Sequence, residues 1–505
     1  MAFKFSEWPP ALTDSQLEAL HLQASTYALA HGLLYLPVQP PLLPTSAIHA
    51  PLSLLPSPFP RRLFDFAQRI QSTYNVLYSR IAMDEDFLDQ IMGTERGVGK
   101  VDTFTGQLWS GWKEIRDQGG VVQVCWIFPR DSVEFEAFKP LHLGLFRSDY
   151  LLYASDSDKL ALRQVEFNTI SSSFGTLSER VANLHRHLYS LTDYFNTSTW
   201  LKAENFPPNQ TTAGLVEGLA AAHAAYNIPG SQILFVVQPS ERNVFDQRWL
   251  EYELLEGHSI HVIRQTFDEL ASSASIDPST SALFVSSIEI STVYFRAGYT
   301  PADYPAQSHF ETRFLLERSK AINCPSIPLQ LAGGKKVQQV LAQPGTLERF
   351  LGEDFTPEQL DELRASWMGM WGLDEPDGIQ KARERSAGLV LKPQREGGGN
   401  NVYKEAIPPF LDTLSTEESQ AWIAMELIVP PEGVKSHLVR VELTGSVKTE
   451  VVSELGIFGW SLFGHKKIVE EKQVGWLVRT KGKDSNEGGV ATGFSVLDSL
   501  LLVDD

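Results

Sequence analysis

A short apolar run that leads into a lysine and a glycine-rich turn constrains the fold of this chain more than any other stretch. Leu389-Val390-Leu391 predict a buried strand, Lys392 stands at its exit, and Glu396 precedes the turn. Glycines let backbone N–H groups approach and point at an anion, and the lysine adds positive charge beside them. The stretch therefore favours a cradle for a nucleotide triphosphate, with Glu396 as a candidate Mg²⁺ ligand. The turn consists of Gly397, Gly398, Gly399, Asn400 and Asn401.

A flexible surface turn would contain such glycines as well, and only the flanking Lys392 and Glu396 favour phosphate binding. The stretch is not a Walker A loop, because no Gly-Lys-Ser or Gly-Lys-Thr opens a helix after it. It also does not match the Gly-x-Gly-x-x-Gly fingerprint of dinucleotide-binding folds. A phosphate site here would therefore belong to another fold.

The chain has 505 residues, enough for about two to four domains. Its 43% hydrophobic and 21% charged residues are typical of a globular protein, and the net charge of −19 argues against a duplex nucleic-acid binder. Only Cys125 and Cys324 occur, far apart, so we expect neither a disulfide framework nor a cysteine zinc site. Residues 1–16 lack the apolar core of a signal peptide, and no run of 18 apolar residues occurs. We expect a cytoplasmic protein with no membrane or nucleic-acid partner.

The first part of the chain combines helical and extended segments. Thr13–Gln16 fits a capping box before a helix, and residues 61–92 have helical periodicity. Eight prolines between residues 37 and 60 exclude a helix there and predict an extended segment. Residues 102–112, polar and aromatic, are expected to form a loop or a helix end, and residues 121–128 a strand.

Residues 163–169 alternate in polarity, which predicts a strand with Glu166 and Asn168 on the same face. A carboxylate and an amide so placed form a plausible two-point metal site, although an exposed strand edge has the same pattern. Residues 171–173 follow as a hydroxyl-rich turn before a helix. Upstream, Arg147 lies between apolar residues.

Helices and strands alternate over residues 212–295, which predicts a compact α/β unit with a partly parallel sheet. Arg242 and Asn243 follow one strand and Arg296 follows another, where ligands of such sheets usually bind. Arginines at these positions favour an anion clamp, although solvent exposure alone would also explain them.

Lys335 and Lys336 open the next predicted helix, where their charge opposes the helix dipole. This unfavourable placement suggests a phosphate between them, and two exposed lysines are the alternative. Residues 361–371 predict a further helix.

The C-terminal part contains a strand over residues 422–429, in which residues 425–428 would either accept an adenine or belong to the core. Glu454 lies in an apolar strand and needs a partner such as a ribose hydroxyl or a cation. A second glycine-rich loop, residues 487–493, follows the cationic residues 479–481.

Seven blocks of the chain carry a resemblance to a known family. They are Leu-Phe-Arg-Ser-Asp-Tyr at 145–150, Glu-Phe-Asn-Thr-Ile-Ser at 166–171, Glu-Arg-Asn-Val-Phe-Asp-Gln at 241–247, Tyr-Phe-Arg-Ala-Gly-Tyr at 294–299, Lys-Pro-Gln-Arg-Glu-Gly-Gly-Gly-Asn-Asn at 392–401, Ser-Glu-Leu-Gly-Ile-Phe-Gly at 453–459 and Arg-Thr-Lys at 479–481. In this order they resemble the eukaryotic-type glutathione synthetases, which are ATP-grasp ligases. The resemblance spans nearly the whole chain and is weakest over the first hundred residues.

The resemblance implies a mixed α/β fold of the ATP-grasp class, with an α/β substrate-binding domain and a mobile glycine-rich lid. Residues 1–211 would form an N-terminal part that contributes metal and substrate ligands. Residues 212–331 would form the substrate-binding domain, and residues 332–505 the nucleotide-binding part with the lid loops.

The resemblance also implies roles for individual residues. Arg147 and Arg479 would be catalytic, and two Mg²⁺ ions would be held by Glu166, Asn168 and Glu396. The residues implied for ATP are Glu166, Lys335, Lys392, Glu396, Gly397, Gly398, Gly399, Asn400, Asn401, Tyr403, Met425, Glu426, Leu427, Ile428, Glu454, Lys481 and Glu487. Those implied for γ-glutamylcysteine or glycine are Arg147, Ser171, Ser173, Glu241, Arg242, Asn243, Gln247, Arg296, Tyr299, Arg479, Val490 and Ala491.

The implied activity is the ATP- and Mg²⁺-dependent ligation of γ-glutamylcysteine to glycine through an acyl phosphate, which yields glutathione, ADP and phosphate. The family also implies a homodimer. One departure concerns Ala491-Thr492, where the family commonly has two alanines that limit the size of the amine. β-Alanine is therefore an alternative amine substrate. The retained Ala491 favours glycine. A non-catalytic nucleotide sensor would need a broken metal or phosphate site, whereas the implied ligands are all present.

Overall fold

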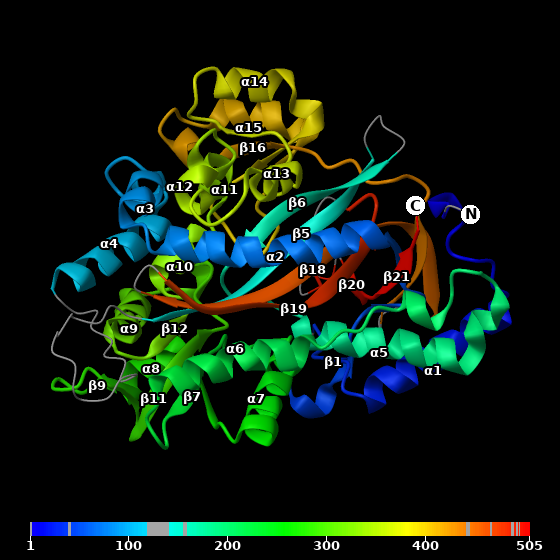
Figure 1. The fold of residues 1–505 in the computed structure, drawn as a ribbon, viewed down its shortest axis with the longest axis horizontal. Helices are drawn as coiled ribbons and strands as arrows, with labels where there is room; N and C mark the ends of the chain where they lie inside the picture. The colour runs from blue at the N-terminus through cyan, green and yellow to red at the C-terminus, as the bar shows by residue number, and fades with distance from the viewer. Residues whose placement is uncertain are drawn as a thin grey trace.

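The computed structural model describes residues 3–38, 42–118, 141–154, 159–440, 445–464, 467–485, 489–490, 493 and 495–504. Within these residues, a sheet of 13 strands forms the centre of the molecule, with helices on both faces (Figure 1). Its strands are β3 (Leu52–Ser53), β5 (His142–Ala154), β6 (Leu160–Asn168), β7 (Gln232–Val236), β8 (Val262–Gln265), β9 (Ala274–Ile276), β10 (Leu283–Val285), β11 (Ile288–Phe295), β12 (Ile322–Cys324), β17 (Lys435–Val439), β18 (Ser446–Gly464), β19 (Lys467–Gly482) and β20 (Ser495–Asp498).

The main sheet has an antiparallel and a partly parallel half. In the first half, β18 forms long antiparallel ladders with β5 and β19, and β6 pairs with β5. In the second half, β7 runs parallel to β11 and β8, which confirms the partly parallel sheet expected over residues 212–295. The two halves join where β12 pairs with β5, so one sheet crosses the expected domain limits. Those limits stay a prediction.

Helices cover both faces of the antiparallel half (Figure 1). The long α2 (Arg61–Ala82) packs on one face, and α5 (Gly175–Thr192) and α6 (Thr211–Tyr226) pack on the other. Beneath α2, the ring of Tyr78 stacks on Phe167 with centroids 3.9 Å apart. Phe458 and Trp460 belong to the separate core under α5 and α6. A one-residue slip in strand register would exchange the side chains that fill these two cores and disrupt the packing of both, so the register is strongly specified.

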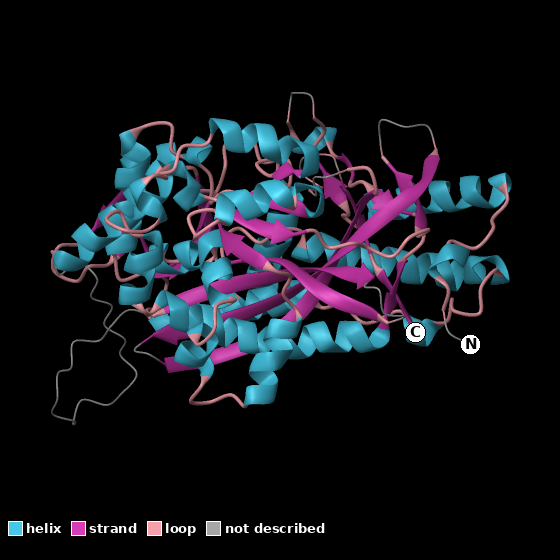
Figure 2. Cartoon of the chain, turned by 90° about the horizontal axis from the view of Figure 1, so that it is seen from above, coloured by secondary structure: helices cyan, strands magenta, loops and turns pink. Residues whose placement is uncertain are grey.

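A second, four-stranded antiparallel sheet lies above the main one in Figure 1. Its order is β13 (Met370–Gly372), β16 (Ile423–Glu426), β14 (Leu389–Lys392) and β15 (Val402–Tyr403). It packs against α14 (Gly378–Glu384) and α15 (Ile407–Thr413) around a small core of its own. The strand expected at 389–391 is confirmed, and the one expected at 422–429 is shorter. The view from above shows strands running through the middle of the molecule with helices around them (Figure 2).

Several expected helices differ from the observed ones. The helix expected over 61–92 is divided into α2 and α3 (Glu85–Met92), because the carboxylate of Asp84 caps a new helix by accepting from Phe87 N. The loop or helix end expected at 102–112 is wrong, since α4 (Thr103–Asp117) begins there under the cap of Asp102. The apolar Phe104, Leu108 and Trp109 of α4 join the core around α2, which the polar-aromatic pattern did not reveal.

The other expected helices and extended segments have mixed outcomes. The capping box at Thr13 starts α1 (Asp14–Ala30). The proline-rich segment is extended where described, in β2 (Ile48–His49), β3 and β4 (Ser57–Pro60), with one 3-10 turn. The helix expected at 361–371 is wrong at its end: α13 (Pro357–Ala365) begins at the cap of Thr356, and Trp371 lies in β13. The strand expected at 121–128 lies outside the described residues.

The remaining elements complete the framework. No helix in the described ranges is both long and apolar enough to span a membrane. Cys324 is a buried free thiol, and Cys125 lies outside the described residues. The remaining helices and strands are β1 (Leu34–Tyr35), α7 (Val244–His258), α8 (Phe267–Ser273), α9 (Gln307–Arg318), α10 (Ile327–Ala332), α11 (Lys335–Leu341), α12 (Thr346–Leu351) and β21 (Leu500–Val503).

Candidate active site

A cavity of about 630 Å³ is lined by residues of the main sheet and of the four-stranded sheet. Segments far apart in the sequence meet there, and Glu166 and Glu396 share it. The predicted site residues that line the cavity are Arg147, Glu166, Asn168, Ser171, Ser173, Tyr299, Lys335, Lys392, Glu396, Gly397, Gly398, Asn400, Asn401, Tyr403, Met425, Glu426, Leu427, Ile428, Glu454, Arg479, Lys481 and Val490.

Some predicted site residues do not line this cavity. Glu487 and Ala491 lie outside the described residues. Arg296 lies directly behind the lining, where its Nη2 donates to Ser173 Oγ at 2.7 Å. The others that do not line it are Gly399, Glu241, Arg242, Asn243 and Gln247. Glu241 accepts from Gln247 Nε2 at 3.0 Å, so this part of the sequence forms a hydrogen-bonded group of its own.

Lys335 connects two carboxylates at the centre of the site. Its Nζ lies 3.0 Å from Glu166 Oε2 and 3.0 Å from Glu396 Oε1, so the two oxygens are no further apart than twice that distance. Burial opposes ionisation of Glu166, but the ammonium of Lys335 lowers the pKa of Glu166 to about 2. Burial raises the pKa of Glu396 above its usual value. The ion pairs offset the cost of placing a cation at the first position of α11.

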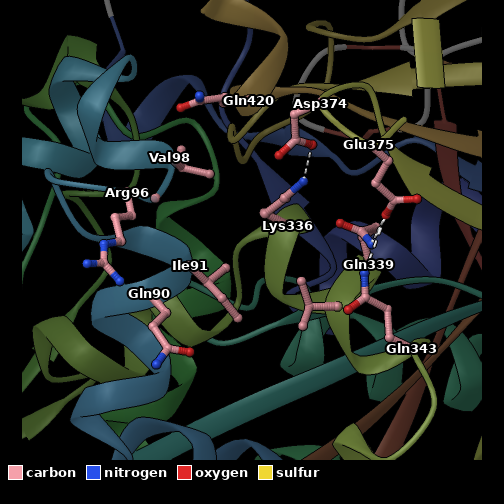
Figure 3. Close-up of a pocket in the computed structure, with 12 residues that line it drawn as sticks. Gln90, Ile91, Arg96, Val98, Lys336, Gln339, Gln343, Asp374, Glu375 and Gln420 are labelled. Carbon is pink, nitrogen blue, oxygen red and sulfur yellow. Dashed lines mark hydrogen bonds and ion pairs between the residues drawn. The ribbon is translucent and has the colours of Figure 1, made fainter. Parts of the chain in front are cut away.

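The next residue, Lys336, faces a different cavity of about 240 Å³ (Figure 3). There it forms an ion pair with Asp374, and the amide of Gln339 donates to Glu375 Oε1 at 2.8 Å. The expectation of one phosphate between Lys335 and Lys336 is therefore wrong for Lys336. Consecutive residues at the start of a helix project in different directions, and here they serve two separate cavities.

Lys392 is buried at the exit of β14, where the sequence placed it. Its Nζ donates to the backbone oxygen of Val165 at 2.8 Å, which connects the four-stranded sheet to β6. Burial lowers the pKa of Lys392 to about 8, with Glu166 acting in the opposite direction. The lysine thus loses its proton more easily than an exposed lysine, and a nearby anion would stabilise its charged form and raise its pKa.

Glu166, Asn168 and Glu396 provide oxygen ligands suited to a hard cation. The amide nitrogen of Asn168 donates to Arg147 O at 3.1 Å and to Asp149 Oδ2 at 3.0 Å, which leaves the amide oxygen to coordinate. No group of three or more His, Cys, Asp or Glu side chains gathers as a metal site in the ranges that the structure describes. Two carboxylates and an amide fit Mg²⁺, which usually completes its shell with phosphate oxygens and water.

The glycine-rich turn needs its glycines for conformational reasons. Gly397, Gly398 and Gly399 have φ angles of 91°, 72° and 77°, in the region that side chains disfavour. Asn400 Nδ2 donates back to Gly398 O at 2.8 Å. A methyl group built on Gly397 would lie 3.6 Å from the ring of Tyr299, so the turn reaches the part of the cavity that Tyr299 lines.

The strand predicted to accept an adenine is both a core strand and a cavity wall. Met425 is buried in β16 and also lines the cavity. The carboxylate of Glu426 forms an ion pair with Arg385, so the backbone rather than this side chain is available to a ligand. Glu454, also in the wall, is paired with Arg479.

The serine turn is held rigidly at the start of α5. Ser171 and Phe174 have positive φ angles of 52° and 68°. The carboxylate of Asp246 accepts from Phe174 N at 2.7 Å and Thr176 N at 3.1 Å, which fixes this strained turn. Behind this turn, Arg296 is buried, and its Nη1 donates to the backbone oxygen of Ser172 at 2.9 Å.

Asp149 is the residue at this site that the sequence reasoning missed. It is fully buried and contacts Arg147, Asn168 and Arg479. Arg147 and Asp149 are two residues apart on β5, so their side chains share one face of the sheet. The block at 145–150 contains both residues, but the contact of Asp149 with Arg479 comes from a distant strand and cannot be read from that block.

Comparisons with known proteins match nearly the whole chain. The family model described as eukaryotic glutathione synthase, ATP binding domain, matches residues 14–502. The glutathione synthetase of Homo sapiens is 40% identical over 500 residues, which cover 98% of this chain and 99% of the human one. The enzyme of Dictyostelium discoideum is 37% identical over 505 residues, covering 97% and 100%. The chloroplastic enzyme of Solanum lycopersicum is 39% identical over 459 residues, covering 90% and 78%.

A solved structure shows the same fold. A glutathione synthetase-like effector of Globodera pallida matches with a TM-score of 0.75 and 23% identity over 98% of each chain. The mixed α/β fold and the ATP-dependent ligase class expected from the seven blocks are confirmed. With a family model over nearly all its length and relatives of up to 40% identity, this chain belongs to the eukaryotic glutathione synthase family.

Proposed function

We propose that this chain joins γ-glutamylcysteine to glycine at the expense of ATP and releases glutathione, ADP and phosphate. One observation supports the proposal. Lys335, Lys392 and the glycine-rich turn line the same cavity as Arg147 and Arg479, in a chain that belongs to this family. Phosphate-binding groups and groups suited to a peptide carboxylate therefore face the same space, as phosphoryl transfer to a carboxylate requires.

The reaction proceeds in two steps. The cysteinyl carboxylate attacks the γ-phosphate of ATP and expels ADP, which gives an acyl phosphate. The amine of glycine then attacks the acyl carbon, phosphate leaves with the electron pair of the broken C–O bond, and the amine loses a proton. Two anions must approach in the first step, so Lys335, Lys392, Arg147 and Arg479 neutralise charge where it gathers.

Glu166, Asn168 and Glu396 would hold Mg²⁺ on the triphosphate, two ions per site in our prediction. Bound there, Mg²⁺ would supply charge neutralisation and orientation of the phosphate oxygens. Lys335, which bridges Glu166 and Glu396, would keep the two carboxylates together and contact the phosphates.

The two ends of the cavity would bind different parts of the substrates. Adenosine would lie along Met425–Ile428, near Tyr403, Glu454 and Lys481, and Glu487, also predicted for ATP, lies outside the described residues. Ser171, Ser173, Tyr299 and Arg147 would contact γ-glutamylcysteine, supported from behind by Arg296, Asn243 and Gln247. The loop 396–403 would close as a lid, because an acyl phosphate must be kept from water. The second predicted lid loop, 487–493, lies in part outside the described residues.

An activity assay with competing amines tests the function directly. Purified protein with γ-glutamylcysteine, ATP, Mg²⁺ and equal glycine, β-alanine and serine should release phosphate and form mainly glutathione, identified by mass spectrometry. A product that contains β-alanine would show that β-alanine, and not glycine, is the amine substrate. Tight ATP binding without turnover of any amine would indicate a nucleotide sensor instead.

The pH dependence of ATP binding tests the role of Lys392. Its ammonium faces Glu166, Lys335, Glu454 and Glu396, and its pKa of about 8 would be raised by bound triphosphate. The free protein loses this proton above pH 8, so ATP affinity is expected to fall there, by up to about tenfold per pH unit.

Calorimetric titrations of ATP at pH 7 to 9.5, in buffers of different ionisation enthalpy, would detect the accompanying proton uptake. Lys392→Met should abolish the dependence, whereas Lys336→Met, at the other cavity, should retain it. An affinity that stays constant across this range would contradict the assignment.

The homodimer and the cytoplasmic location stay predictions. Sedimentation would check the first, and cell fractionation the second.

A further inference from the structure

We infer that Asp149 and Gly456 are positioning residues that fix the guanidinium groups of Arg147 and Arg479 at the cavity wall. Neither Asp149 nor Gly456 lines the cavity in the described structure, and both lie in the sheet beneath it. The inference rests on the proposed ligase function, because it concerns how the two arginines are presented to the dipeptide.

The carboxylate of Asp149 holds side chains from three strands. It binds Arg147 of its own strand through a two-pronged contact, Oδ1 to Nε at 2.6 Å and Oδ2 to Nη2 at 2.7 Å. Oδ2 also accepts from Arg479 Nη2 of β19 at 3.1 Å and from Asn168 Nδ2 of β6 at 3.0 Å. A paired, two-pronged contact of this kind fixes orientation as well as position.

The contact leaves one edge of Arg147 for the cavity. Because Nε and Nη2 are bound to Asp149, Nη1 is the remaining nitrogen, and it donates to Ser173 O at 3.2 Å beside the serine turn. The guanidinium is planar, so fixing two nitrogens fixes the third. The ring of Phe458 lies 5.9 Å from the guanidinium carbon and limits its movement further.

Asp149 also keeps two cations close together. Arg479 lies between Asp149 and Glu454, and Arg147 lies on the other side of Asp149. Without the shared carboxylate the two guanidinium groups would repel each other and separate, since like charges in a buried site interact strongly. The arrangement therefore prepares two positive groups for one anionic substrate.

Gly456 provides the space for this ion pair. It lies opposite Asp149 in the ladder between β5 and β18. A methyl group built on it would lie 2.8 Å from Arg147 Cδ and 2.9 Å from Asp149 Oδ1, closer than real contacts allow. Glycine weakens the interior of a strand, and its presence there often marks a close approach of this kind.

The test compares Asp149→Asn and Gly456→Ala by steady-state kinetics. Asp149→Asn keeps the shape but removes the charge, and kcat/KM for γ-glutamylcysteine is expected to fall about 10²–10³-fold. Gly456→Ala leaves every charged group in place, and its added methyl is expected to raise KM for γ-glutamylcysteine about tenfold. The affinity of Gly456→Ala for ATP alone should stay within about threefold of wild type, because Arg147, which the added methyl would displace, is proposed to bind the dipeptide and not the nucleotide.

The double variant provides a readout that a merely structural role would not give. Both changes act on the same ion pair, so the double variant should be no more than about threefold worse than Asp149→Asn alone. Two controls isolate the effect. Glu317→Gln breaks another buried pair, Glu317 with Arg313 at 2.8 Å, and Gly482→Ala adds a methyl on β19 with no atom within 4 Å. Both should keep the wild-type KM.

The outcomes separate the two hypotheses. If the wild-type protein forms no glutathione, the proposed function fails. If it does, and the two variants lower only the melting temperature or their effects multiply in the double variant, the positioning role is overturned. Should Asp149→Asn not fold, the KM of Gly456→Ala decides alone.

Discussion

Glu396→Gln is expected to lower kcat about 10²–10³-fold while the protein remains folded. The change removes one of the two carboxylates proposed to hold Mg²⁺ and keeps the size of the side chain. Lys335 would retain Glu166 as a partner at 3.0 Å, so the helix that carries the lysine should stay in place. The measurement is kcat against Mg²⁺ concentration at saturating substrates, with the melting temperature as a check on folding.

A control for this variant is Glu405→Gln, an exposed glutamate two residues after Tyr403. Its kcat and Mg²⁺ dependence should match wild type, because it does not line the cavity. Near-normal activity of Glu396→Gln at limiting Mg²⁺ would rule out the metal role. In that case the glutamate would serve only as the partner of Lys335.

Arg479→Ala is expected to lower kcat/KM for γ-glutamylcysteine about 10²-fold and to leave the dissociation constant of ATP within about threefold. Arg479 contacts Asp149 at 3.1 Å and pairs with Glu454, so it lies between the ends of the cavity that we propose for the dipeptide and for adenosine. Its loss removes a positive group from the approach of two anions. Steady-state kinetics and nucleotide titrations of the same preparation distinguish the two effects.

Lys472→Ala is the matched control, since Lys472 lies on the same strand but pairs with Glu217 away from the cavity. It should behave as wild type in both measurements. A variant Arg479→Ala that binds γ-glutamylcysteine normally and loses only ATP would overturn the assignment. The residue would then act with Glu454 at the nucleotide.

The sequence predicted which residues of one short stretch share a cavity more accurately than it predicted helix ends. Lys392, Glu396, Gly397 and Gly398 line the cavity together because they are neighbours in the chain, and their roles in binding stay a prediction. The helix at 103–117 could not be recognised in the same way, because Trp109 and its neighbours are stabilised by packing against α2, a tertiary contact. The end of the helix predicted at 361–371 was missed because Trp371 pairs with β16.

Residues whose role depends on pairing between distant strands were also beyond reach. Asp149 becomes significant only once Arg479 lies beside it, and nothing in the local pattern predicts that neighbour. Gly456 looks like a weak point of a strand until Arg147 is placed against it. In the sequence, Lys336 and Lys335 are equivalent candidates for phosphate binding. Only the direction of each side chain in the structure shows that they line different cavities.

The dependence of the site on distant strands has a consequence for biosynthesis. β5 carries Arg147, yet its partner β18 leaves the ribosome about 300 residues later, several tens of seconds at ordinary synthesis rates. Until then an apolar hairpin of β5 and β6 has an open edge that invites wrong pairing. We therefore expect slow, late maturation and a need for chaperone protection of the growing chain.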